Sequence, residues 1–407
     1  MPSPLDRPVK FHIRTLGCKM NWLDSARLSA ALSSAGHLPV TDEADADYVL
    51  VNSCTVTAQA DRKSRQQANA ARRAQKQVAV LGCGPRVDAD AYRRQLGDTL
   101  VFGSEAEMLD YFGVEEESDP LPLNTRTRLP VAIQTGCDDL CSFCITRIAR
   151  GRHRNLPLES ILRQIRQAEE LGLKEIVLTG INLAAWGCEN TRRPEESRLH
   201  ELLAEILARS DIPRIRLSSL GPQYLHDGFF ELFADPRICD HLHLSVQSGC
   251  DATLRRMQRG HGVEELFSVA ERARRARPDV GLAADLIVGF PGETEEEFET
   301  TLDAVRSLGF SRLHVFPFSP REGTPAAGMS PTVAPEVKKA RAARLRELGS
   351  RLRDAFIASQ LGREREVLVE SNETGLTGNY LRISTPGIRE NAIHTVRITA
   401  DRVLRGG

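Results

Sequence analysis

Three cysteines occur within the eight residues from Cys137 to Cys144, with the spacing C-x3-C-x2-C, and this loop directly follows an apolar segment at 131–134. Three thiolates on one short loop can ligate three corners of an iron–sulfur cubane and leave the fourth iron open. The alternative is a zinc site or a set of free thiols. Zinc normally takes four protein ligands in a structural site, and the sequence offers no nearby pair to complete one. The loop therefore predicts an open metal cluster at the end of a strand.

A regular series of strand and helix segments continues behind this loop. A helix is expected at 158–171, and helical segments separate the later apolar runs. About six β/α units predict an open, partial barrel over residues 130–350, with its site at the carboxyl ends of the strands. The predicted strands are 131–134, 175–178, 215–218, 241–246, 281–288 and 312–316.

The first 113 residues predict a separate, parallel α/β domain. Its expected strands, 9–13, 48–52 and 78–81, are each followed by a cysteine. Ligands bind at the carboxyl edge of such a sheet, so the three thiols are expected to meet there and form a second open site. Three unrelated buried thiols are the alternative interpretation. The cysteines concerned are Cys18, Cys54 and Cys83.

The remaining segments are an acidic, proline-bearing linker at 114–129 and a tail at 351–407. A long amphipathic helix at 333–361 leads into the tail, and three β-like runs follow at 366–370, 380–384 and 394–399. These three short runs can form only a small structure, and they predict a small antiparallel β-barrel of the kind that binds oligonucleotides. Residues 338–407 contain 14 Lys and Arg against 8 Asp and Glu, which favours a polyanionic partner.

Composition excludes several other classes of protein. The 407 residues are 41% hydrophobic and 27% charged, as in ordinary globular proteins, and no apolar run approaches the ~20 residues that span a bilayer. The polar N-terminus shows no signal-peptide core. We therefore expect a cytoplasmic protein with no membrane association, in which clustered cysteines are metal ligands rather than disulfides.

Taken together, these motifs resemble the methylthiotransferase family of radical S-adenosylmethionine enzymes along essentially the whole chain. The tail is similar to the family's small RNA-binding barrel, the TRAM domain. Lys19 after the first cysteine favours the branch that acts on N6-threonylcarbamoyladenosine in tRNA, as do the runs at 149–152, 314–319 and 323–325. The motifs that carry the resemblance are 15–21, 52–57, 82–83, 137–152, 178–182, 243–249 and 288–294.

The resemblance implies an enzyme that adds a methylthio group at C2 of N6-threonylcarbamoyladenosine at tRNA position 37, next to the anticodon. It implies two 4Fe-4S clusters, and S-adenosylmethionine as both radical source and methyl donor. The implied partners are the tRNA anticodon stem-loop, a flavodoxin- or ferredoxin-type electron donor and a sulfur donor, and we expect a monomer. The alternatives are the same chemistry on N6-isopentenyladenosine in tRNA or on an aspartate of a ribosomal protein, and a non-catalytic iron–sulfur RNA-binding protein.

The resemblance also assigns roles to single residues. No catalytic residue is expected beyond the cluster ligands. Gly221 stands where relatives often have an acidic residue, and Cys250 replaces a usual serine. The polar cofactor candidates could equally be satisfied internal residues, and the arginines a solvated basic face. The predicted cluster ligands are Cys18, Cys54, Cys83, Cys137, Cys141 and Cys144; the cofactor contacts are Phe143, Thr179, Asn182, Ser218 and Gln247; the RNA contacts are Arg147, Arg150, Arg152, Arg154, Tyr380 and Arg382.

Overall fold

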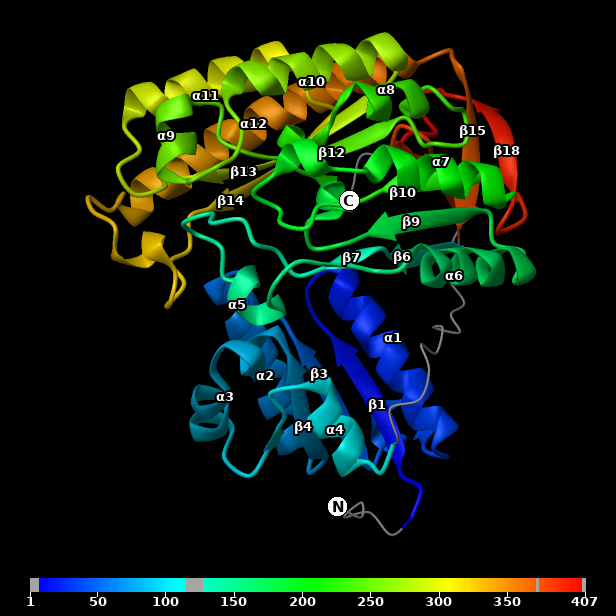
Figure 1. Cartoon of the computed structure of the whole chain (residues 1–407), viewed down its shortest axis with the longest axis vertical. Coiled ribbons are helices and arrows are strands. Elements are labelled where there is room, and N and C mark those ends of the chain that lie inside the picture. The colour runs from blue at the N-terminus through cyan, green and yellow to red at the C-terminus, as the bar shows by residue number, and fades with distance from the viewer. Residues whose placement is uncertain (1–6, 115–126, 371–372, 405–407) are drawn as a thin grey trace. The chain divides into compact units, whose positions relative to one another are not determined.

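The computed structural model describes residues 7–114, 127–370 and 373–404, which form two compact units (Figure 1). The first unit comprises the chain up to residue 125 together with 143–152 and 319–324. The second unit comprises 126–142, 153–318 and 325–407. Most of the predicted linker, residues 115–126, lies outside the described residues.

The first unit is built on a parallel sheet with the strand order β2-β1-β3-β4-β5. Every residue of the central strand β3 is buried, which explains the apolar run at 48–51 that begins it. Helices α1 and α4 pack on one face of the sheet, and α2 and α3 pack on the other. The strands are β1 (Lys10–Thr15), β2 (Leu38–Pro39), β3 (Tyr48–Ser53), β4 (Gln77–Gly82) and β5 (Leu100–Val101); the helices are α1 (Lys19–Ser34), α2 (Ala58–Arg73), α3 (Cys83–Leu96), α4 (Glu105–Tyr111) and α5 (Thr146–Arg150).

The second unit contains the β/α series that the sequence predicts. Two parallel sheets, β10-β9-β6 and β11-β12-β13-β14, make up the partial barrel. The chain leaves the first sheet at Ser218, between β10 and β11. The strands are β6 (Arg128–Ala132), β9 (Glu175–Thr179), β10 (Arg214–Leu217), β11 (Ser219–Leu220), β12 (His241–Gln247), β13 (Gly281–Val288) and β14 (Arg312–Pro317).

Seven helices accompany these strands, and a large apolar core lies between the helices and the sheets. In β12 the residues Leu242, Leu244 and Val246 are buried, whereas the alternate residues His243, Ser245 and Gln247 are partly exposed. This alternation directs one face of the strand to the core and the other into the partial barrel. The helices are α6 (Leu158–Glu170), α7 (Leu199–Arg209), α8 (Asp227–Phe233), α9 (Asp251–Arg256), α10 (Val263–Ala276), α11 (Glu295–Leu308) and α12 (Pro335–Gln360).

The tail forms an antiparallel sheet with the order β17-β16-β15-β18. The described residues do not close it into the barrel that the sequence predicts. The strand β16 was not expected, because its sequence Thr-Gly-Leu-Thr reads as a turn. The strands are β15 (Glu364–Glu370), β16 (Thr374–Thr377), β17 (Arg382–Ser384) and β18 (Ile393–Arg397). Over the described ranges, we find no helix with the length and apolar character needed to cross a bilayer.

Candidate functional site

Three cysteines of the first unit lie at the carboxyl ends of neighbouring strands. Cys54 and Cys83 directly follow β3 and β4, and Cys18 follows β1 by three residues. Because β3 pairs with both β1 and β4, the three strand ends share one edge of the sheet. The structure therefore brings together the three thiols that the sequence predicts to meet.

The side chain of Asn21 stands between two of these thiols. Its Oδ1 lies 3.9 Å from Sγ of Cys18 and 3.5 Å from Sγ of Cys83. Its Nδ2 donates hydrogen bonds of 2.8 Å to the carbonyls of Leu16 and Ser53, which fix the direction of the amide. Asn21 is therefore a residue of this corner that the sequence reasoning missed, although it ends the first cysteine motif.

Gly17 allows the thiol of Cys54 to lie close to the loop that carries Cys18. Its φ of +99° lies in the region that favours glycine, and a Cβ at this position would lie 2.8 Å from Cβ of Cys54 and 2.9 Å from its Sγ. No side chain larger than a hydrogen atom fits without moving the cysteine. The loop that carries Cys18 can thus pack directly on Cys54.

Arg150 supplies a positive charge to this group of thiols. It is buried, its Nη1 lies 2.6 Å from Oδ2 of Asp24, and its Nη2 donates to Oδ1 of Asn21. Its buried Nε has no hydrogen-bond partner among the described residues. The structure does not support the predicted RNA contact for Arg150, because its guanidinium faces Asp24 and the cysteines instead of solvent.

Burial and charge act in opposite directions in this corner. Burial raises the pKa of the Cys54 and Cys83 thiols, and the nearby Arg150 partly offsets this effect. Burial disfavours the charged form of Arg150, but Asp24 and the neighbouring cysteines outweigh it, so the pKa of Arg150 lies above its ordinary value. On balance the pKa values of both thiols are raised, so burial outweighs the arginine in this corner.

The second cysteine loop begins in the second unit, beside the ends of β9 and β12. Sγ of Cys141 accepts a 3.1 Å hydrogen bond from Nη1 of Arg259, whose Nη2 donates to the carbonyl of Ser245. Ser142 anchors the loop through a 2.9 Å hydrogen bond from its Oγ to the carbonyl of Arg256. Arg259 is a second cation at a cysteine that the sequence did not reveal.

Cys137 lies beside a polar network that the sequence reasoning found only in part. Nδ2 of Asn182 is 3.8 Å from Sγ of Cys137 and 3.0 Å from Oη of Tyr224. Oη of Tyr224 donates in turn to Oδ1 of Asp139, at 2.9 Å. Asn182 therefore supports the cysteine loop, together with Asp139 of the loop itself and with Tyr224, which carries no motif signal.

The other predicted cofactor contacts lie at strand ends of the barrel but differ in their bonding. Thr179 is buried, and its Oγ1 donates to the carbonyl of Val177, as a satisfied internal hydroxyl would. Ser218 is buried, and its Oγ has no hydrogen-bond partner among the described residues. Gln247 ends β12 with a φ of +70°. Phe143 and Cys144 are half-buried and belong to the segment 143–152 of the first unit.

The predicted RNA contacts are also of different kinds. Arg147, Arg152 and Arg154 are exposed, the first two in the first unit and the third in the second. Arg382 is exposed, with its Nη1 3.7 Å from Glu370. The ring of Tyr380 is half-buried and already stacked on a neighbouring histidine, so it is less available to an RNA base than the sequence suggests.

The donor set consists of thiols, which are the usual ligands of iron–sulfur clusters. Over the described ranges, no three His, Cys, Asp or Glu side chains are arranged to hold one metal ion. Thiolates that bind different irons of a cluster stand farther apart than thiolates that share one ion. Converging thiols with a buried cation beside them are compatible with a cluster at 18, 54 and 83.

Two models of known protein families match this chain. Residues 131–305 match the Radical SAM superfamily, and residues 10–103 match the uncharacterized protein family UPF0004. A radical S-adenosylmethionine methyltransferase, TsrM from Kitasatospora setae, shares the fold with a TM-score of 0.60 and 14% identity, over 79% of this chain and 77% of that chain. The chain is a radical S-adenosylmethionine enzyme, a class whose cofactors are an iron–sulfur cluster and S-adenosylmethionine.

Curated relatives define the family within this class. The Thermotoga maritima protein named threonylcarbamoyladenosine tRNA methylthiotransferase MtaB is 34% identical, over 95% of this chain and 93% of its own length. The MtaB of Bacillus subtilis is 33% identical over 98% of this chain and 94% of its own length. A tRNA-2-methylthio-N(6)-dimethylallyladenosine synthase of Sphingopyxis alaskensis is 32% identical over 97% of this chain and 96% of its own length. The chain belongs to the methylthiotransferase family, in the branch whose members are named MtaB.

Proposed function

We propose that this protein adds a methylthio group at C2 of N6-threonylcarbamoyladenosine at position 37 of tRNA, in the cytoplasm. The names of its MtaB relatives support this substrate, since the chain matches them over nearly their whole length. The observation that carries the proposal is the convergence of three strand-end thiols in the first unit, which adds a second sulfur-rich site to a radical enzyme.

The cysteines divide into two ligand sets in this proposal. Cys137, Cys141 and Cys144 would hold one 4Fe-4S cluster, and Cys18, Cys54 and Cys83 would hold the other. When bound, the clusters and S-adenosylmethionine supply a reducing electron, a carbon radical, sulfur and a methyl group.

The surrounding residues would position the two ligand sets. Arg259 donates to the sulfur of Cys141 and so places a positive charge beside this proposed ligand. Asn182 and Tyr224 hold the start of the same loop. In the first unit, Arg150 would place a positive charge beside anionic sulfur, and its hydrogen bond to Oδ1 of Asn21 would hold the guanidinium there.

Replacing single cysteines tests the division into two sets. After anaerobic reconstitution, Cys54→Ala should lose iron and sulfide from one cluster but still cleave S-adenosylmethionine to deoxyadenosine on reduction. Cys141→Ala should lose the other cluster and the cleavage. Cys188→Ala is the matched control, because this buried thiol donates to the carbonyl of Arg193 and lies outside both sets. If Cys54→Ala kept the full iron content, the proposed second cluster would be refuted.

The substrate is tested separately. The reconstituted protein should convert unmethylthiolated tRNA that carries N6-threonylcarbamoyladenosine to its 2-methylthio derivative, detected by mass spectrometry of the nucleosides. The second candidate is N6-dimethylallyladenosine in tRNA, because relatives with that named substrate are 32–35% identical. A product formed only on tRNA with dimethylallyladenosine would reassign the substrate and leave the chemistry unchanged.

A further inference from the structure

One arginine of the second unit donates directly to a cysteine sulfur. Nη1 of Arg259 lies 3.1 Å from Sγ of Cys141, and its Nη2 donates to the carbonyl of Ser245 at 2.8 Å. The chain just before this arginine also holds the cysteine loop, because the backbone N–H of Ser142 donates to the carbonyl of Met257 at 3.0 Å. Hydrogen bonds therefore fix both the guanidinium and the loop that carries the thiol.

Among the described residues, no Asp or Glu forms an ion pair with Arg259, and its buried Nε has no hydrogen-bond partner there. Asp251 and Glu265 line the same surface pocket. Oδ1 of Asp251 accepts a 2.8 Å hydrogen bond from the backbone of Val263, and burial raises the pKa of Glu265, which disfavours its charged form. The positive charge of Arg259 is therefore left to act on the sulfur beside it.

This charge also acts on a neighbouring histidine. His261 is buried, and its Nε2 lies 3.2 Å from the carbonyl of Val246. Burial lowers the pKa of His261 to about 3, and the charge of Arg259 contributes in the same direction. His261 is therefore uncharged at neutral pH and adds no second positive charge to that of Arg259.

Two neutral donors approach Cys137, the first cysteine of the loop. The backbone N–H of Asp139 lies 3.4 Å from its Sγ, and Nδ2 of Asn182 lies 3.8 Å away. Hydrogen bonds to sulfur and the net charge nearby both set the reduction potential of an iron–sulfur cluster. Reduction adds one negative charge, so a full positive charge at a ligand favours the reduced form more than a neutral donor does.

We propose that Arg259 sets the reduction potential of the cluster that the 137–144 loop would hold, by placing a positive charge and a hydrogen bond at the sulfur of Cys141. The electron comes from an external one-electron donor, which is oxidised as the cluster is reduced. By stabilising the reduced form, Arg259 would allow a milder donor to supply this electron. The inference rests on the proposed function, because it takes Cys141 as a cluster ligand.

The test measures the midpoint potential of this cluster in the whole reconstituted chain, by anaerobic titration followed with electron paramagnetic resonance. Arg259→Gln removes the charge and should lower the ratio of reduced to oxidised cluster at a fixed potential about tenfold, a shift of about 59 mV for one electron. Arg259→Lys keeps the charge without the planar fork, and its midpoint should lie close to that of the unaltered protein. Each variant is also measured together with Cys54→Ala, so that the signal comes from one cluster.

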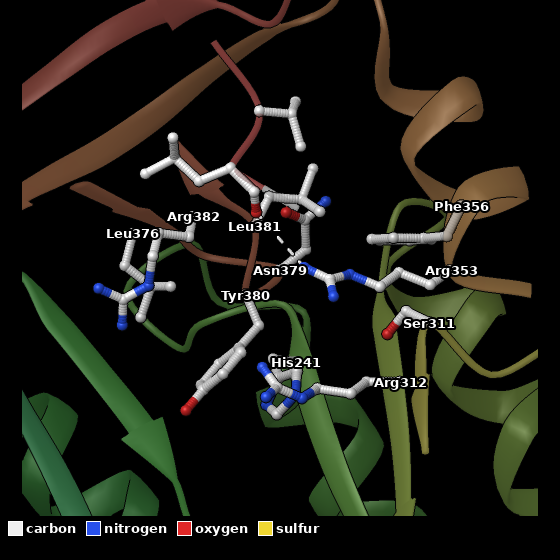
Figure 2. Close-up of a pocket in the computed structure, with 12 residues that line it drawn as sticks. His241, Ser311, Arg312, Arg353, Phe356, Leu376, Asn379, Tyr380, Leu381 and Arg382 are labelled. Carbon is white, nitrogen blue, oxygen red and sulfur yellow. Dashed lines mark hydrogen bonds between the residues drawn. The ribbon is translucent and has the colours of Figure 1, made fainter. Parts of the chain in front are cut away.

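Two other arginines serve as matched controls. Arg255 is exposed on α9, where solvent and salt screen its charge, so Arg255→Gln should shift the midpoint far less than Arg259→Gln does. Arg353 is half-buried like Arg259, but it lines a cavity with His241 and Arg312, the first residues of β12 and β14 (Figure 2). The seven residues of β12 place that end about 20 Å from the end beside the cysteine loop. Arg353→Gln should leave the midpoint unchanged.

The variants separate the charge of Arg259 from its other contacts. A midpoint that falls in Arg259→Gln and stays near its original value in the other variants supports the inference. An unchanged midpoint in Arg259→Gln overturns it. If Arg259→Lys or Arg353→Gln falls as far as Arg259→Gln, the positive charge at Cys141 is not the cause, and the inference is likewise overturned.

Incomplete loading does not obscure the result, because a midpoint potential describes only the molecules that hold the cluster. If Arg259→Gln holds no cluster, Arg259→Lys decides: an unaltered midpoint supports the inference, and a loss of about tenfold in the reduced fraction overturns it. The proposed function fails separately if Cys141→Ala keeps all of its iron, because Cys141 is then no ligand, whatever the midpoints of the arginine variants.

Discussion

At the scale of single residues, the cysteines could be found from the sequence but their supporting side chains could not. Cysteine spacing and position after a strand are local signals, so all six cysteines stand out. Arg150 lies in a run of basic residues, and nothing in that run indicates that this one arginine turns inward. Its partner Asp24 is 126 residues away in the chain, so only the folded structure joins them.

Replacing Arg150 by Gln should destabilise the first unit. The side chains of Arg150 and Asp24 are only 3% and 15% exposed, and loss of one partner leaves a buried charge unpaired. Such losses cost about 3–5 kcal/mol of unfolding free energy. Urea denaturation of the reconstituted protein measures the effect, together with the iron and sulfide content.

The matched control is Arg147→Gln on the same short helix, where the side chain is exposed and the expected change is within about 0.5 kcal/mol. Combining Arg150→Gln with Asp24→Asn should recover part of the stability, because no unpaired charge then remains. Equal stability of the Arg150 and Arg147 variants would show that the buried pair has no such role.

At the scale of elements, the long apolar runs were predicted well and the short or polar elements were not. Strands β3, β12 and β13 lie within one residue of their predicted ends, since burial on both faces or regular alternation marks them clearly. Helix α1 begins at Lys19, directly after Cys18, and its first turn contributes Asn21 to the cysteine corner. The short β16 depends on pairing with β15, which a local pattern does not reveal.

Glu175 at the start of β9 should make the second unit sensitive to acid. It is fully buried among Arg216, Arg214 and Arg128; burial alone would raise the pKa of its carboxyl, but the arginines outweigh burial and lower the pKa to about 2. A depressed folded pKa gives stability that is present above the ordinary value of 4.5 and is lost as the pH falls toward 2.

The variant Glu175→Gln tests this prediction. It should lower the unfolding free energy at pH 7 by about 3–5 kcal/mol, because the buried cations Arg214 and Arg216 lose their partner. The difference from the unaltered protein should shrink as the pH falls below 4.5, as measured by urea midpoints from pH 7 to pH 2.5. A difference that stays constant with pH would show that the carboxylate charge is not the cause.

At the scale of the whole molecule, the sequence predicts the α/β architecture and the partial barrel, and solved radical enzymes confirm that fold class. The tail is where the prediction and the structure differ. The sequence suggests a small, independent barrel, whereas the structure shows an antiparallel sheet that belongs to the second unit. The side chains that join the tail to the barrel, Arg214 and Arg216, donate to the carbonyls of Leu376, Thr377 and Gly378.

Removal of residues 363–407 should therefore destabilise the second unit as well as weaken RNA binding. Three hydrogen bonds from buried guanidiniums would be lost, each worth about 1.5–3 kcal/mol when one partner is charged. Differential scanning calorimetry should show a lower melting temperature for the truncated protein than for the full chain. An unchanged melting temperature would mean that the tail is an independent module, as the sequence alone suggests.

The strand order of the first unit has a consequence for how such a chain can change over time. Cys18, Cys54 and Cys83 depend on the adjacency of β1, β3 and β4 and not on the number of residues between them. Turns at the opposite edge, such as residues 74–76 before β4, can lengthen or shorten without displacing a single sulfur atom. Natural variants should accordingly accumulate insertions and deletions at that edge. The segments that lead from each cysteine into the following helix should keep a constant number of residues.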